Sequence, residues 1–237
     1  MLLYYITGII LIPGILLATY AQAKVSSAYS QYSKVYSKSG ITAYEMTRGV
    51  LSRAGLNHIQ IRRVNGRLTD FYDHQNGVIG LSQGVFDSSS IAALGIAAHE
   101  VGHALQYADN YAPIKIRNFL VPVVNFTSRL MWPLVIIGII FGLAVPGTMI
   151  GDIVIYAGLV FYGSSILISL VTLPTELNAS RRATALLTES GILSVSEAKG
   201  AKEVLNAAAW TYIASLVTAL LSMLRFLAII FMSRDRK

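Results

Sequence analysis

The residues best suited to chemistry in this 237-residue chain form one short run, His99-Glu100-Val101-Gly102-His103. On a helix, positions i and i+4 lie one turn apart on the same face, so His99 and His103 can direct two imidazole nitrogens at one metal ion. Glu100 lies beside them, where its carboxylate can reach a water molecule on that metal. The pattern therefore indicates hydrolysis by a zinc-activated water, with Glu100 as the base.

The flanks of this run favour a rigid, buried helix. Ser88-Ser89-Ser90 offers N-caps at its start. Apolar residues recur at helical spacing, namely Ile91, Leu94, Ala98, Val101 and Leu105. Small residues that allow close packing lie between them, namely Ala93, Gly95, Ala97 and Gly102. The alternative is a helix whose polar face carries two histidines and a glutamate by chance. The chain has only four histidines, so that coincidence would be rare.

The composition is that of a membrane protein. Hydrophobic residues make up 54% of the chain and charged residues 13%, about half of the ~25% found in soluble domains. The mean hydropathy is +0.57. There is no cysteine, so a metal must be bound by histidine and carboxylate. The net charge of +7 is scattered and reports membrane orientation, not nucleic-acid binding.

Hydropathy predicts four transmembrane helices, at residues 2–20, 130–145, 153–173 (ended by Pro174) and 206–232. The resulting segments are an N-terminal membrane anchor (1–23), a peptidase segment with the metal helix (24–118), a transmembrane hairpin (119–173), a second polar segment (174–208), and a C-terminal transmembrane helix with a tail (209–237). Ala21-Gln22-Ala23 resembles a signal-peptide cleavage site, but residues 1–5 contain no lysine or arginine. An uncleaved anchor is therefore expected.

The first polar segment predicts a small mixed core. A helix is expected over 41–54, ended by Gly55, and strands over 59–64 and 78–82. The second strand directly precedes the metal helix, so we expect it to bind substrate as an edge strand through Val78, Ile79, Gly80 and Leu81. The alternative is a strand that only covers the core.

The basic residues predict the orientation in the membrane. Residues 24–129 contain eleven lysines and arginines and residues 174–208 contain four, whereas the turn at 146–152 contains none. The positive-inside rule places both polar segments in the cytoplasm and the N-terminus outside. The tail carries three basic residues on the outer face, which opposes this assignment.

Zinc bound by two histidines needs a third protein ligand. Two crossings separate the two polar segments, so both lie on one side of the membrane and Asp152 lies on the other. This excludes Asp152 and leaves several candidates on the side of the metal helix: Glu176, Glu189, Glu197, Glu203, His58, His74 and Asp109.

Three stretches resemble the YugP-like membrane zinc metallopeptidases: residues 67–73, 88–106 and 173–183. More distantly the chain is similar to the HtpX-type gluzincins, in which HExxH is followed by E-x-x-A-[DS]. The resemblance implies that Glu176 is the third ligand. It also implies a mostly α membrane protein with four transmembrane helices and a small α+β gluzincin-like core. Phe71 and Leu177-Asn178 depart from the family pattern, which has His and Phe-Asp there.

The function expected from these residues is zinc-dependent endopeptidase activity. One Zn²⁺ is held by His99, His103 and Glu176, and an oxyanion donor is sought among Arg181, Arg182 and Tyr107. The expected partners are a protein or peptide substrate and the lipid bilayer of a bacterial cell, without nucleic acid. The oligomeric state has no sequence signal. The alternative is an inactive zinc-binding membrane adaptor, which commonly loses the base or a ligand.

Overall fold

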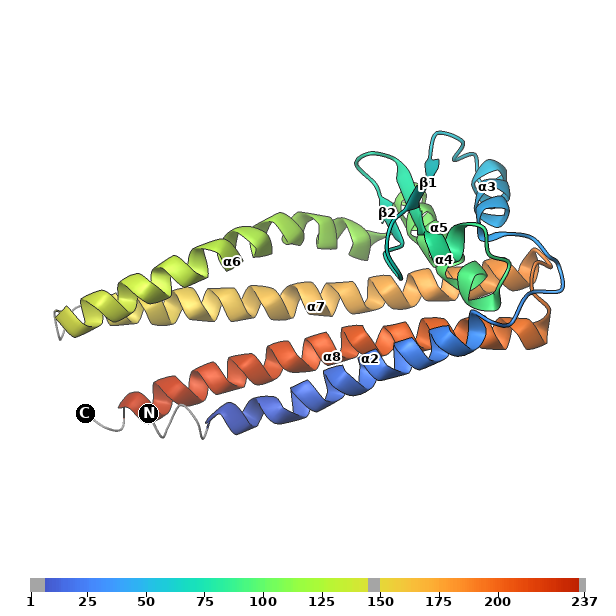
Figure 1. Cartoon of the computed structure of the whole chain (residues 1–237). Helices are drawn as coiled ribbons and strands as arrows, with labels where there is room; N and C mark the ends of the chain where they lie inside the picture. The colour runs from blue at the N-terminus through green and yellow to red at the C-terminus, as the bar shows by residue number, and fades with distance from the viewer. Residues whose placement is uncertain (1–6, 145–149, 235–237) are drawn as a thin grey trace. The chain divides into compact units, whose positions relative to one another are not determined.

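The computed structural model describes residues 7–144 and 150–234, which are mostly helical (Figure 1). The elements in chain order are η1 (Ile9–Leu11), α2 (Ile12–Tyr32), α3 (Ala43–Arg53), β1 (Gln60–Val64), β2 (Phe71–Asp73), β3 (Val78–Ser82), α4 (Gln83–Phe86), α5 (Ile91–Ala108), α6 (Ala112–Ala144), α7 (Ile150–Glu189) and α8 (Val195–Arg234). The predicted helix over 41–54 and the two predicted strands are confirmed within one or two residues.

The chain divides into two compact units. Residues 1–19, 115–173 and 212–237 form one, which we call the helical unit. Residues 20–114 and 174–211 form the other, the mixed unit, which contains the sheet and α3 to α5. Each long helix among α2, α7 and α8 contributes a part to both units.

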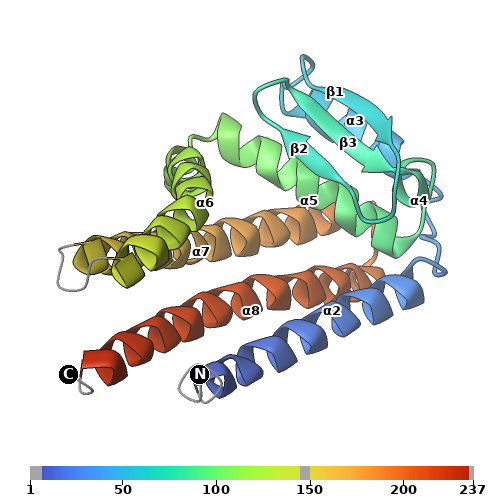
Figure 2. The same cartoon turned by 60° about the vertical axis from the view of Figure 1, so that its left-hand side comes forward.

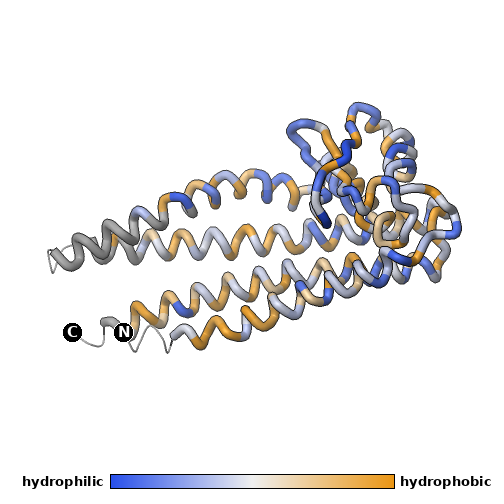
Figure 3. The backbone as a smooth tube through the Cα atoms, in the orientation of Figure 1, coloured by the Kyte–Doolittle hydropathy of each residue, from blue (hydrophilic) through white to orange (hydrophobic). Residues whose placement is uncertain are grey.

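Among the described residues, three helices are long and apolar enough to cross a membrane: Ile9–Tyr32, Tyr156–Glu189 and Val195–Phe231. Figure 3 shows apolar residues along α2, α7 and α8. The predicted span at 130–145 falls largely in α6, but its last residue lies outside the described residues and it is not one of these three. That span therefore stays a prediction, and the predicted turn at 146–147 also lies outside the described residues.

Close helix contacts in the helical unit depend on glycine. A Cβ on Gly158 of α7 would lie 2.2 Å from the ring of Phe226 on α8. A Cβ on Gly14 of α2 would lie 3.0 Å from the hydroxyl of Thr218 on α8. Small residues are the usual means of packing helices closely in membranes.

Pro174 does not end the helix, because α7 continues unbroken to Glu189, and the end of the third membrane span at residue 173 stays a prediction. Proline removes one backbone donor from a helix, but membrane helices tolerate this where neighbouring groups satisfy the freed carbonyl. As a result Glu176 lies inside a continuous helix instead of in its first turn.

The prediction that residues 78–82 form an edge strand is also wrong. β3 is the central strand of a three-stranded sheet with the order β1-β3-β2 (Figure 2). It pairs in parallel with β1 over all five residues and antiparallel with β2 over three. Both edges of β3 are paired, and all five of its residues are buried. A peptide could add to this sheet only along β1 or β2.

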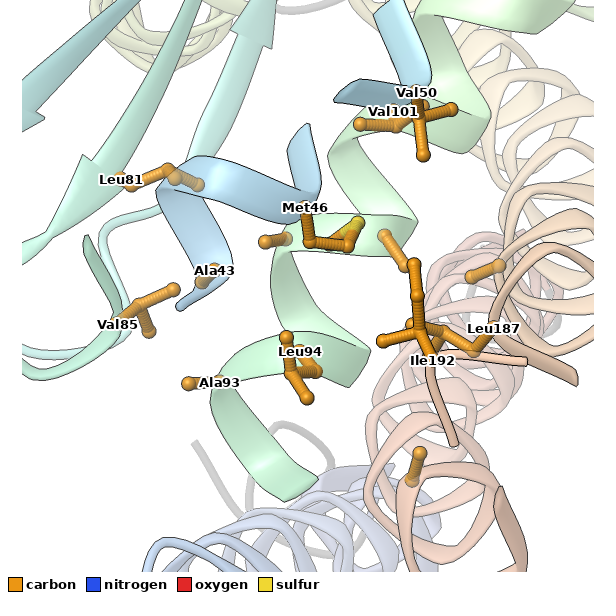
Figure 4. Close-up of a cluster of buried hydrophobic side chains, with 14 of the residues drawn as sticks. Ala43, Met46, Val50, Leu81, Val85, Ala93, Leu94, Val101, Leu187 and Ile192 are labelled. Carbon is orange, nitrogen blue, oxygen red and sulfur yellow. The ribbon is translucent and has the colours of Figure 1, made fainter. Parts of the chain in front are cut away.

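The hydrophobic core of the mixed unit surrounds α5. Figure 4 shows Leu94 and Val101 of α5 with Met46 of α3 and Leu187 of α7 in one cluster. Ser90 caps the start of α5, as its hydroxyl accepts a hydrogen bond from the Ala93 N–H at 3.2 Å. The core thus holds α5 against both the sheet layer and the mixed-unit part of α7.

Candidate metal centre

The metal-binding face of α5 lies against α7 because Gly102 has no side chain. A Cβ at Gly102 would lie 2.7 Å from the carbonyl oxygen of Ala179 on α7. Gly102 stands immediately before His103, and Ala179 stands three residues after Glu176. The close backbone approach therefore brings Glu176 to the two histidines.

The three predicted ligands come together. Oε2 of Glu176 lies 3.2 Å from Nε2 of His99 and 3.4 Å from Nε2 of His103. Suitable atoms of all three residues lie within 4.8 Å of one another. Zinc binds nitrogen and oxygen at about 2.0–2.2 Å, so tetrahedral ligands are about 3.3–3.6 Å apart. The donor atoms and their spacing fit one zinc ion.

A chain of hydrogen bonds fixes the tautomer of His103. The Arg182 Nε–H donates to Oδ1 of Asn178 at 2.9 Å, which defines the orientation of that amide. The Gln106 amide donates to the same Oδ1 at 3.0 Å and to the Thr175 carbonyl at 2.8 Å. Its Oε1 then faces Nδ1 of His103 at 2.9 Å. His103 must carry its proton on Nδ1, which leaves the Nε2 lone pair for a metal.

Ser180 contacts the other histidine on the side away from Glu176. Its hydroxyl lies 3.2 Å from Nδ1 of His99. Since Nε2 of His99 faces Glu176, Ser180 supports the ring orientation in which that nitrogen points into the site. Both histidines are therefore held by residues of α7 or by groups bonded to α7.

Glu100 is buried, at 8% exposure, beside the ligands. Burial raises the pKa of Glu100, and the negative charges of Glu176 and Asp70 act in the same direction, while His99 and His103 oppose them. A carboxylate with a raised pKa is a stronger proton acceptor, as a general base requires.

Asp70 lies near Glu100 and is bonded to the central strand. It accepts hydrogen bonds from the Ser82 N–H at 2.7 Å and from the Ser82 hydroxyl at 3.0 Å. Burial raises the pKa of Asp70 although both of these hydrogen bonds act to lower it. Asp70 therefore ties the loop before β2 to the end of β3.

The other acidic and histidine candidates for the third ligand have different surroundings. Asp109 forms an ion pair with Arg182. The ring of His74 stacks on Tyr107 at 3.8 Å. Glu197 accepts from Ser194 and Lys38, Glu203 accepts from Tyr32, and both His58 and Glu189 are exposed. Within the described residues, His99, His103 and Glu176 are the group that could hold a metal.

The three suggested oxyanion donors lie in different places. Arg182 is engaged with Asp109 and Asn178. Arg181 lines a groove between α7 and α8. Tyr107 is one helical turn beyond His103, between the rings of Tyr72 and His74. An oxyanion role for any of them stays a prediction.

Sequence reasoning missed the residues that support the ligands, namely Gln106, Asn178, Ser180 and Asp70. One signal was available for Gln106, because it follows His103 by three positions and so shares its helix face. Asn178 and Ser180 lie two and four positions after Glu176. This spacing identifies them only after Glu176 is known to lie against α5.

Two histidines and a glutamate from two helices, with a buried glutamate beside them, define a candidate zinc hydrolase centre. The family model described as "putative neutral zinc metallopeptidase" matches residues 7–231, and this chain belongs to that family. The chain is 38% identical over 220 residues to "Putative membrane protease YugP" of Bacillus subtilis (strain 168), a match that covers 92% of this chain and 94% of that protein. No solved structure matches this chain.

Proposed function

We propose that this protein is a membrane-embedded, zinc-dependent endopeptidase. The observation that carries the proposal is the convergence of one Glu176 oxygen on Nε2 of both His99 and His103, at 3.2 and 3.4 Å. Membership of the zinc metallopeptidase family and the similarity to a membrane protease support it. His99, His103 and Glu176 would hold one zinc ion, which would supply Lewis acidity toward water and a peptide carbonyl.

The remaining chemistry belongs to Glu100. Its position beside the ligands suits it to take a proton from the attacking water and to deliver that proton to the leaving amine. Burial excludes bulk water from its carboxylate and raises its pKa, which makes Glu100 a stronger acceptor for the proton of the water. The Gln106 amide keeps the proton of His103 on Nδ1 throughout, so that Nε2 stays a ligand.

The proposal includes four membrane spans, with both polar segments in the cytoplasm. Three candidate spans and the basic residues of the polar segments support it. His99, His103 and Glu176 must share one side of the bilayer to bind one ion. This requires an even number of crossings between residues 103 and 176, and a span in α6 together with the span in α7 supplies two.

The test measures zinc and cleavage together in the purified full-length protein. Zinc is quantified by atomic emission, and hydrolysis is followed on a library of peptides. Glu100→Gln should keep about one zinc per chain and lose hydrolysis by two or more orders of magnitude. Glu176→Ala should lose both zinc and hydrolysis, as His99→Ala should.

Matched variants of the other candidate ligands complete this test. His58→Ala, His74→Ala and Asp109→Ala should each keep their zinc. If one of them loses zinc while Glu176→Ala keeps it, the ligand assignment is wrong. If the wild-type protein binds zinc but cleaves no peptide in the library, the inactive adaptor is the better description.

A further inference from the structure

A groove between α7 and α8 lies within the mixed unit and is separate from the metal ligands. Its volume is about 380 Å³. Residues of both helices line it, among them Leu177, Arg181 and Ala185 from α7 and Lys202, Leu205 and Asn206 from α8. The spacing of i, i+4 and i+8 on α7 shows that one face of that helix forms one wall.

The groove is positively charged. Arg181 and Lys202 are both exposed at its rim, and none of the residues that line it is acidic. Among the described residues, neither side chain forms an ion pair; Arg181 contacts only the Leu177 carbonyl, at 3.4 Å. Two cations across a groove without a carboxylate favour an anionic ligand.

The two cations lie at the ends of apolar helix segments. In α7 the uncharged run 153–175 ends six residues before Arg181, which is about 9 Å at 1.5 Å per residue. In α8 the uncharged run 204–224 begins two residues after Lys202, about 3 Å along the helix. Lipid head groups occupy about 5–8 Å outside the hydrocarbon on each side of a bilayer. Lys202 therefore lies within the head-group layer and Arg181 just outside it, where its long side chain can reach back to the lipid phosphates.

We propose that this groove binds the phosphate-bearing head group of an anionic phospholipid from the surrounding bilayer. The forked guanidinium of Arg181 suits a phosphate, and Lys202 adds a second positive charge from the opposite helix. The apolar side chains of Leu177, Ala185 and Leu205 provide contact for the glycerol backbone. Ser180, whose hydroxyl contacts His99, lines the same groove, so the lipid would bind directly behind a metal ligand.

The test counts lipids bound to the purified full-length protein by native mass spectrometry. The protein is placed in neutral detergent with equal amounts of phosphatidylglycerol and phosphatidylcholine. We expect at least a fivefold preference for phosphatidylglycerol, because one basic residue near an anionic lipid contributes about that factor. Arg181→Gln/Lys202→Gln should bind the two lipids about equally, whereas the control Arg48→Gln/Arg53→Gln, which removes two exposed charges from α3, should keep the preference.

A second variant tests the shape of the groove independently of its charge. Ala185→Leu places a larger side chain in the groove and leaves both cations, and it should lose phosphatidylglycerol binding by at least about threefold. Thermal unfolding verifies that each variant is folded. If the double variant does not fold, lipid binding by Ala185→Leu is the deciding measurement. Unchanged preference in the folded groove variants overturns the proposal. The proposal is also overturned if the α3 control loses the preference for phosphatidylglycerol to the same extent. Displacement of the lipid by equimolar inorganic phosphate, or by an equimolar glutamate-rich peptide, has the same consequence.

Discussion

At the scale of single residues, the candidate metal centre depends on side chains that are not among its three proposed ligands. The amide of Gln106 is completely buried, and each of its polar atoms has a partner. A buried amide in this position can hold His103 in one tautomer and one orientation at once. Such partners orient the histidine ligand, and their loss commonly lowers metal affinity or activity.

Gln106→Leu should therefore weaken zinc binding by about 10- to 100-fold. Leucine cannot accept the proton of His103 Nδ1, so the ring is free to turn or to change tautomer. Competition with a chelating dye measures the effect on purified protein. Gln106→Glu, which keeps an acceptor for His103, should lose less affinity than Gln106→Leu. Equal zinc affinity in the wild type and in Gln106→Leu would show that the amide does not position His103.

Asp70 provides a prediction about pH. Because burial raises its pKa in the folded state, the folded protein binds more protons than the unfolded chain at pH values just above the unfolded pKa of about 3.9. The contribution of Asp70 to stability should thus decrease as the pH rises through this window. Asp70→Asn retains partners for Ser82 and does not titrate. The melting temperature of this variant minus that of the wild type should therefore increase as the pH rises through the window, and then level off.

Asp73→Asn is the matched control, with the opposite sign. Hydrogen bonds from the side chain and backbone of Asn76 lower the pKa of Asp73, so its contribution to stability is present above the unfolded pKa and disappears as the pH falls. Thermal unfolding in detergent between about pH 4 and pH 8 compares both variants with the wild type. A melting-temperature difference for Asp70→Asn that is constant with pH would contradict the assignment.

At the scale of elements, the site exists because α5 and α7 approach at Gly102. Neither helix carries the whole site: α5 supplies His99, Glu100 and His103, and α7 supplies Glu176. The sheet buttresses α5 from another side, since β3 and the core around Leu94 bury its apolar face. The spacing between the two helices thus determines whether three donor atoms can reach one ion.

Gly102→Ala should separate these helices. The added Cβ would lie 2.7 Å from the backbone oxygen of Ala179, and backbone cannot move aside cheaply. We expect a loss of about 1–3 kcal/mol in the free energy of unfolding, as for other overpacked cores, together with weaker zinc binding. Gly49→Ala in α3 is the control, because nothing lies within 4 Å of its added Cβ. That variant should be neutral or more stable by up to about 1 kcal/mol. Similar stability for the two variants would show that the close approach at Gly102 is not required.

At the scale of the whole molecule, the proposed zinc ion would tie together two parts of the chain that the predicted membrane crossings separate. The ligands His103 and Glu176 are 73 positions apart, and the segment between them contains α6 and most of the apolar part of α7. Any arrangement of spans must return the chain to the same side of the bilayer before Glu176. All three proposed ligands belong to the mixed unit.

Cysteine labelling tests this arrangement, since the chain has no native cysteine. Ser52→Cys and Ser196→Cys lie at exposed positions of the two polar segments. A membrane-impermeant maleimide should label neither in intact cells and both after lysis. Ser233→Cys in the predicted external tail is the positive control and should label in intact cells. Labelling of only one of the two polar segments would refute an even number of crossings between the ligands.

Local sequence patterns were enough to propose the chemistry and to place most of the elements. His99, Glu100 and His103 were identified because helical periodicity is local: the relation between i and i+4 needs no knowledge of the rest of the fold. The metal helix, the helix over 43–53, and strands β1 and β3 were found for the same reason. Glu176 was implied by resemblance, whereas the counting of membrane crossings left several candidates open.

How these elements meet could not be predicted from local patterns and became visible in the folded structure. Strand order is a non-local property, so the sequence predicted the strand at 78–82 but not that β1 and β2 cover both of its edges. Pro174 read as a helix end because local rules disfavour proline inside a helix, yet α7 continues through it. The pairing of His103 with Gln106, Asn178 and Arg182 crosses between α5 and α7. Such contacts depend on the distance and rotation between two packed helices, which periodicity within either helix does not specify.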